Sequence, residues 1–139
     1  MIDAEAQIYE FIKGEVLAAY PNAYVTDEYV RQPPRMPCVS IEERNNALWR
    51  NTRTGSIGFE NHAALMYEVN VYTNNINGKK QLARNILAVA DEAFARKNFS
   101  RTMISPIPNL ADATIYRLTA RYQAVVGPDG EGGFISHIR

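Results

Sequence analysis

The stretch that decides the fold runs from Ala64 to Val126 and opens with residues 64–94, ALMYEVNVYTNNINGKKQLARNILAVADEAF. Residues 98–126, NFSRTMISPIPNLADATIYRLTARYQAVV, complete it. At both ends of the stretch, aromatic and β-branched residues alternate with polar ones, which is the period of a half-buried strand. Between the ends, apolar residues recur at helical spacing. The stretch therefore predicts two strong strands on either side of one amphipathic helix.

The two predicted strands each have a more apolar and a more polar face. In the first strand the apolar face carries Leu65, Tyr67, Val69, Val71 and Thr73, and the other face carries Met66, Glu68, Asn70 and Tyr72. In the last strand, residues 114–126, the apolar face carries Tyr116, Leu118, Ala120, Tyr122 and Ala124, and the other face carries Ile115, Arg117, Thr119, Arg121, Gln123 and Val125. This pattern suits a sheet that packs on helices behind and is partly covered in front.

The helix between these strands is predicted over about residues 78–97. Its expected buried stripe consists of Leu82, Ile86, Val89, Ala90, Ala93 and Phe94. Lys79, Lys80 and Arg84 lie in its first two turns, where the helix dipole disfavours positive charge. A solvated face explains these cations most simply, and an acidic partner is the alternative.

The rest of the chain extends the same pattern. The remaining predicted elements are a helix at residues 3–20 and strands at residues 23–30, 38–44 and 99–104. Residues 127–139 are glycine-rich and are predicted to be a flexible C-terminal tail; Phe134–Ile138 within it forms either a small edge strand or a segment that orders on a partner. Runs of strands around two helices predict one α+β domain over residues 1–139, a mostly antiparallel sheet with both helices on one face.

Residues 45–63, NNALWRNTRTGSIGFENHA, are predicted to form a projecting hairpin arm or a long loop. Long loops without secondary structure usually serve a function. Trp49, Arg50, Arg53 and Phe59 are of the types that dominate binding interfaces, and an arginine–aromatic group can also grip nucleic acid. The neutral charge of the chain favours a protein interface.

Composition excludes several classes of protein. The formal net charge is zero, so the chain lacks the positive field of a duplex-DNA binder. No apolar run approaches the roughly 20 residues of a membrane span, which predicts no membrane partner. The N-terminus carries acids where a secretory signal carries basic residues, which favours a cytoplasmic site of synthesis.

No catalytic constellation is visible in the sequence. Adjacent Glu42 and Glu43 point to opposite faces of a strand, and only Glu68 could join one of them as a metal ligand. Asp91 and Glu92 are most simply a solvated face of the helix. The lone Cys38 is expected to be a small buried hydrophobe. No histidine pair with metal spacing and no phosphate-binding motif occurs. We therefore expect neither an enzyme nor a cofactor or metal site.

Most of the chain resembles the tail completion, or tail-terminator, proteins of long-tailed phages and prophages. The resemblance lies in the acidic first helix and in four further stretches: residues 28–43 (EYVRQPPRMPCVSIEE), residues 60–80 (ENHAALMYEVNVYTNNINGKK), VADEAF at 89–94, and residues 99–127. It implies a structural virion protein of α+β fold, without a cofactor or a reaction. Subunits of that family form a hexameric ring that caps the tail tube, stops its polymerisation and forms the tail side of the head–tail joint.

This resemblance sets the expected partners and location. The partners are copies of the chain itself, the tail-tube protein and a neck or head-closure protein, while DNA only passes through the ring lumen. The location is the tail–neck region of the virion, after assembly in the bacterial host cytoplasm. Two alternatives stay open: a head-closure or neck ring protein, and a small nucleic-acid-binding protein.

The residues expected to make these contacts come from the exposure pattern, because the family has no short motif to transfer. Ring formation needs two different patches on each subunit. We expect the arm to reach a neighbouring subunit or the tube, and Arg117, Arg121 and Gln123 on the polar face of the last strand to form the other side of a ring contact.

Overall fold

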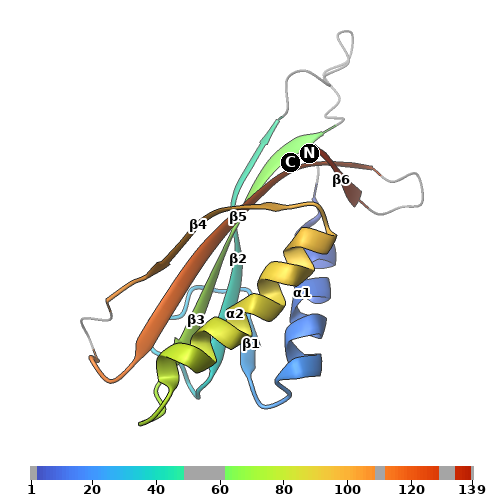
Figure 1. The fold of residues 1–139 in the computed structure, drawn as a ribbon. Coiled ribbons are helices and arrows are strands. Elements are labelled where there is room, and N and C mark those ends of the chain that lie inside the picture. Colours follow the sequence, from blue (N-terminus) through green and yellow to red (C-terminus); the bar gives the residue numbers. More distant parts are fainter. Residues whose placement is uncertain (1–2, 49–61, 109–111, 129–133, 139) are drawn as a thin grey trace, which may run out of the picture.

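The computed structural model describes residues 3–48, 62–108, 112–128 and 134–138. Its elements in chain order are α1 (Glu5–Ala19), β1 (Tyr24–Thr26), β2 (Cys38–Leu48), β3 (Ala63–Thr73), α2 (Lys79–Arg96), β4 (Ser100–Pro106), β5 (Tyr116–Pro128) and β6 (Phe134–Ile138). Two helices pack against one mixed, mostly antiparallel sheet, which confirms the predicted α+β class (Figure 1).

The sheet has the strand order β1-β2-β3-β5-β4. Only β1 and β2 run parallel; the other neighbours are antiparallel. The short strand β6 pairs with residues 125–128 of β5, beyond the point where β4 ends. Because β3 pairs with the opposite side of β5 at these residues, β6 lies on the same side of β5 as β4. The two outer edges of the sheet are therefore formed by β1 on one side and by β4 with β6 on the other.

Several predicted boundaries were wrong. β1 ends at Thr26 instead of residue 30, because the Thr26 hydroxyl accepts a hydrogen bond from the Glu28 N–H and a turn begins there. β2 continues to Leu48, so the first four residues of the predicted arm belong to the sheet, after a bulge between Glu43 and Asn45. Residues 127–128, predicted as the start of the tail, complete β5 instead. Phe134–Ile138 forms the strand β6, which confirms the edge-strand alternative for that segment.

The hydrophobic core lies between the helices and one face of the sheet. An aromatic cluster forms its centre: the Phe94 ring stacks on Tyr122 at 4.3 Å between centroids and lies 5.2 Å from Phe99 and 5.7 Å from Tyr67. Helix α1 adds Ile8, Ile12 and Val16 to the core. Alternation in β3 and β5 thus places the expected apolar faces against the helices.

Helix α2 is rotated slightly from its predicted orientation. Its buried residues are Ala83, Ile86, Leu87, Ala90, Ala93 and Phe94. Leu82 and Val89, which we expected in the stripe, are only half-buried at its margin. Gly78 precedes the helix with a φ of 77°, a left-handed conformation that favours glycine. The rotation leaves Lys80 and Arg84 exposed on the outer side of the helix.

Candidate interaction surface

The sheet face opposite the helices, which we call the open face, carries a polar network built by strand register. In β3 and β5, Glu68 stands opposite Arg121, Asn70 opposite Thr119, and Tyr72 opposite Arg117. On the other side of β3, residues Glu42, Ser40 and Cys38 of β2 stand opposite the same three positions. Directly opposed residues on one sheet face have Cβ atoms about 4.5–5.5 Å apart, close enough for side chains to bond.

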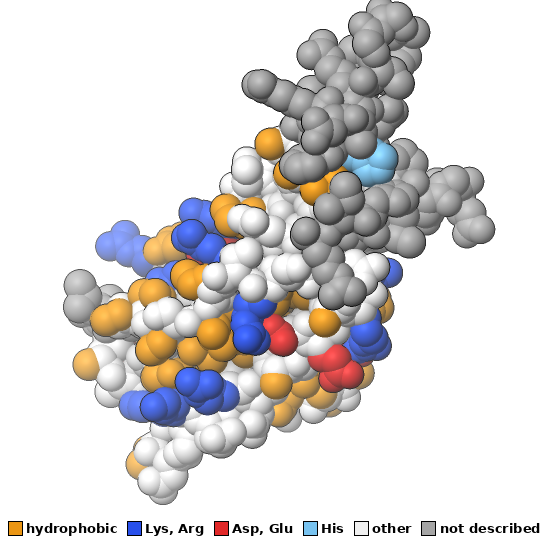
Figure 2. Space-filling model, turned by 45° about the horizontal axis from the view of Figure 1, so that its top comes forward, with side chains coloured by type: hydrophobic (Ala, Val, Ile, Leu, Met, Phe, Trp, Pro, Cys, Tyr) orange, Lys and Arg blue, Asp and Glu red, His pale blue; other side chains and the backbone are white. Residues whose placement is uncertain are grey.

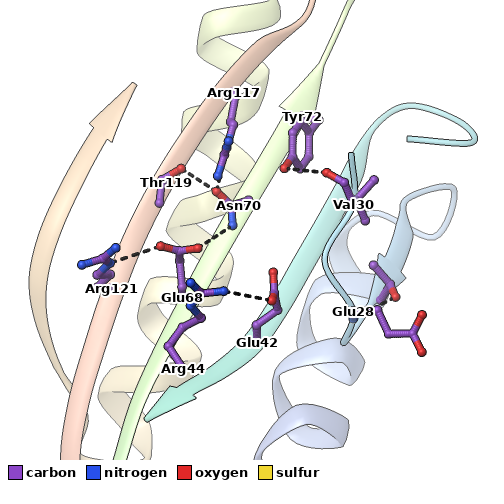
Figure 3. A network of polar contacts seen from close by, with 11 residues as sticks. Glu28, Val30, Glu42, Arg44, Glu68, Asn70, Tyr72, Arg117, Thr119 and Arg121 are labelled. Atoms are coloured by element: carbon purple, nitrogen blue, oxygen red, sulfur yellow. Dashed lines mark hydrogen bonds and ion pairs between the residues drawn. The ribbon is translucent and has the colours of Figure 1, made fainter. Parts of the chain in front are cut away.

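Asn70 is the centre of this network (Figure 3). Its Oδ1 accepts hydrogen bonds from Arg117 Nε at 2.9 Å and from Thr119 Oγ1 at 2.5 Å. Its Nδ2 donates to Glu68 Oε2 at 3.2 Å, and Glu68 Oε1 accepts from Arg121 Nε at 3.1 Å. Asn70 and Thr119 are only 1% and 2% exposed. The longer side chains of the network therefore shield the shorter ones from solvent.

The two glutamates of the open face differ in their partners. Glu68 bonds both Asn70 and Arg121, whereas Glu42 has, among the described residues, only Arg44 as a partner, whose Nη1 lies 3.4 Å from Oε2. Burial, with the Glu68 charge in addition, raises the pKa of Glu42 despite the opposing effect of Arg44. The buried Glu42 Oε1 and Ser40 Oγ atoms have no hydrogen-bond partner among the described residues.

The three predicted contact residues of β5 lie on the open face as expected, but two of them are already engaged within the chain. Arg121 bonds Glu68, and Arg117 bonds Asn70 and lies with its guanidinium carbon 5.7 Å from the centroid of the Tyr72 ring. Gln123 is exposed, with Nε2 3.7 Å from the sulfur of Met66. The arginines therefore hold the open face together, and alternation alone could not reveal this because it gives the face and not the partner.

The cations at the start of α2 also divide into engaged and unpaired groups. Lys79 Nζ donates to the carbonyl of Thr114 at 3.2 Å. The side chains of Lys80 and Arg84 have no ion pair or hydrogen bond with any described residue. They lie one turn apart on the exposed side of α2. On the face of the molecule drawn in Figure 2, hydrophobic side chains lie among Lys and Arg side chains.

A hollow of about 210 Å³ lies beside Arg84, between α2 and the edge strand β4. It is lined by Arg84, Leu87, Ala88 and Asp91 of α2 and by Arg101 and Ile104 of β4. Ile104 is 40% exposed, which is unusual for a large hydrophobic side chain in this domain. The hollow is smaller than the roughly 300–1,000 Å³ of most small-molecule sites, so its size fits a side chain of another protein.

Asp91 is not the solvated residue that we expected. Its Oδ1 accepts from the buried Tyr122 hydroxyl at 2.9 Å and from Arg101 Nη1 at 3.1 Å. Burial, with the Asp91 bond and charge in addition, raises the pKa of Tyr122. Asp91 thus connects the aromatic core to β4 and neutralises Arg101, while Arg84 has no ion pair within the described part of the chain.

The opposite edge of the sheet carries a second feature, which the sequence patterns did not reveal. The turn after β1 exposes Asp27, Glu28 and Tyr29 in succession, and Tyr29 is 64% exposed. Neither acid has an ion pair with a described residue. The strand predicted at residues 23–30 includes all three. The run of two acidic residues and one aromatic residue was the sequence signal that could have indicated a contact site here.

Three other candidate features give less support for an interaction site. A larger hollow of about 480 Å³ lies at the β4–β5 connection, lined by Pro106, Ile107, Pro108, Ala113, Ile115, Tyr116 and Arg117. The arm residues Trp49, Arg50, Arg53 and Phe59 lie outside the described part of the chain. Cys38 is fully buried, as expected, and burial raises its pKa to about 11.

The described residues show no grouping suited to a metal ion. No cluster of three or more His, Cys, Asp or Glu side chains occurs among them. Within the same residues, neither helix is long and apolar enough to cross a membrane.

No family model matches the chain, and no curated protein matches it significantly. A function is therefore argued from the residues of this chain.

Proposed function

We propose that this protein is a phage tail terminator, which assembles as a ring, caps the tail tube and forms the tail side of the head–tail joint. The proposal rests first on the resemblance of residues 28–43, 60–80, 89–94 and 99–127 to that family. The family's α+β class agrees with the observed fold.

The observation that carries the proposal is the difference between the two sheet edges. Beside the β4 edge, α2 presents Lys80 and Arg84 next to a hollow with both charged and apolar lining, and the β1 edge presents two acids beside an exposed tyrosine. None of these four charged side chains has an ion pair with a described residue. A ring requires a heterologous contact, in which one patch meets a different patch of the next copy. Complementary patches at opposite ends of one sheet satisfy this requirement, whereas an enzyme would need convergent chemical groups around a cleft.

A neck or head-closure ring would need the same kind of contact, so its partner must separate the two roles. A terminator binds the open end of a tail tube, and a neck protein binds a ring on the portal side. A nucleic-acid-binding protein would instead bind DNA or RNA with an affinity that falls steeply with salt.

The test is mass determination by light scattering on the purified chain, alone and mixed with its cognate tail-tube protein. We expect a ring-sized species, or short tubes capped at one end, in the mixture. The double variant Trp49→Ala with Arg53→Ala tests the predicted arm in the same assay and is expected to weaken tube binding without unfolding the domain. A strict monomer that leaves tube length unchanged would overturn the proposal.

A further inference from the structure

We propose that the turn Asp27–Tyr29 of one subunit docks in the hollow between α2 and β4 of the next subunit. This contact rests on the proposed ring and names the residues that close it. Tyr29 would lie against Ile104 and Ala88, and the two acids would face Arg84 and Lys80. The partner is thus a second copy of this chain.

The receiving side combines positive charge with an apolar floor. Of the two arginines that line the hollow, Arg101 is paired with Asp91 at 3.1 Å and Arg84 has no partner among the described residues. Lys80 lies one helical turn before Arg84 and is likewise unpaired in the described chain. The hollow therefore has a surplus of positive charge, and the exposed Ile104 and Ala88 provide an apolar contact for an aromatic ring.

The inserted side has the complementary chemistry. Asp27 and Glu28 are exposed and have no ion pair with a described residue. Figure 3 shows the Glu28 side chain pointing away from the polar network of the open face. Tyr29 follows directly, and exposed tyrosines beside charged groups are among the residues that dominate binding energies at interfaces.

The turn is held at both ends, which reduces the entropy lost on docking. On one side, the Glu28 N–H donates to Thr26 Oγ1 at 3.2 Å. On the other side, the Tyr72 hydroxyl of β3 donates to the carbonyl of Val30 at 3.3 Å. A segment that is already ordered in the free subunit binds more tightly than one that must be ordered first.

The placement of the two patches fits a ring. The strand order puts β1 and β4 at opposite edges of the sheet, so each subunit can give its turn to one neighbour and receive a turn from the other. Nucleic acid is a less suitable occupant, because the hollow also presents Asp91 and apolar side chains.

The test uses charge reversal on each side of the contact. Arg84→Glu and Glu28→Lys should each raise the protein concentration at half-assembly by about tenfold or more, because like charges then face each other. Glu10→Lys reverses an exposed acid on α1 and is the matched control, with assembly like that of the wild type. Circular dichroism and thermal melting would verify that all three variants fold.

Mixing the two charge-reversal variants tests the contact more sharply than either variant alone. In an equimolar mixture of Arg84→Glu and Glu28→Lys subunits, alternation brings the two substituted side chains, now of opposite charge, together at one contact and restores the native pair at the next. We expect assembly to recover in the mixture and in the double variant. Independently, Tyr29→Cys combined with Ile104→Cys should yield a ladder of disulfide-linked subunits under oxidation, while either single variant should not.

The outcomes separate this contact from the proposed function. A wild-type ring that neither reversal disturbs, or reversals that mixing does not rescue, would overturn the contact and leave the terminator proposal standing. A wild-type chain that never assembles, alone or with tube protein, would overturn both. Loss of salt-sensitive nucleic-acid binding in Arg84→Glu, with assembly unchanged, would assign the hollow to phosphate and overturn the contact.

Discussion

The two faces of the central sheet bury side chains by different means. On the helix face, Tyr67 and Tyr122 are 0% and 1% exposed and pack in an aromatic cluster. On the open face, Asn70 and Thr119 are about as inaccessible, yet they are surrounded by charged and polar side chains. Burial in this protein therefore does not distinguish a hydrophobic core from a polar network.

The difference has a thermodynamic consequence. Apolar burial is non-directional and scales with area, so the helix face depends on volume and shape. A buried polar group depends on its partners, because an unsatisfied donor or acceptor loses its hydration without compensation. Variants of the helix face should therefore act through lost volume, and variants of the open face through lost hydrogen bonds.

The largest effect is expected in the aromatic cluster. Phe94→Ala removes the ring that contacts Tyr67, Phe99 and Tyr122 and should lower the free energy of unfolding by about 3–5 kcal/mol. Urea denaturation followed by circular dichroism measures this change. Leu82→Ala, at the half-buried margin of α2, is the control and should cost less than half as much. Equal costs would contradict a core centred on Phe94.

A smaller effect is expected at the centre of the polar network. Asn70→Ala leaves Arg117 Nε and the Thr119 hydroxyl without their acceptor and removes a donor to Glu68, so it should cost about 2 kcal/mol. Thr119→Val removes one bond at similar volume and should cost about 1 kcal/mol. The same denaturation experiment applies. If Asn70→Ala unfolded like the wild type, the open face would have to be stabilised by packing.

The two glutamates of the open face sharpen the comparison further, because they should respond oppositely. Glu68→Gln weakens the bond to the half-exposed Arg121 and should destabilise by about 0.5–1 kcal/mol. Glu42→Gln removes a buried carboxylate opposite Glu68 and should stabilise at neutral pH by about the same amount.

The effect of Glu42→Gln should depend on pH. The pKa of Glu42 is raised in the folded state, so its ionisation opposes folding above that pKa and this cost disappears as the pH falls through it. The advantage of the variant should therefore shrink as the pH is lowered from about 7 to about 4. Chemical denaturation at several pH values measures this trend. An advantage that is independent of pH would mean that repulsion and burial of the carboxylate are not its cause.

The smallest effect on stability is expected at the sheet edges. Arg84 is exposed and unpaired within the described chain, so Arg84→Glu should change the free energy of unfolding by no more than about 0.5 kcal/mol. Thermal melting at low protein concentration measures this without a contribution from assembly. A large destabilisation would mean that Arg84 supports the fold, and assembly defects of the variant would then result from unfolding.

Sequence patterning determined the fold class and the content of both sheet faces. Period-two alternation in residues 65–73 and 116–126 put the correct side chains toward the helices, since side-chain direction in a strand depends only on position. Helical spacing located α1 and α2 to within two residues of their ends. Exact strand ends were less predictable: Asn45 and Asn46 are poor strand formers, and pairing with β3 overrides that preference.

Only the tertiary structure decided which side chains meet. Register between β3 and β5, set by residues far apart in the chain, pairs Arg121 with Glu68 and Arg117 with Asn70. Packing of α2 beside β4 creates the hollow and leaves Arg84 unpaired within the described residues, while the strand order places Asp27–Tyr29 at the other edge. Local sequence fixes the face on which a side chain lies, but its partners depend on long-range packing, which no local pattern encodes.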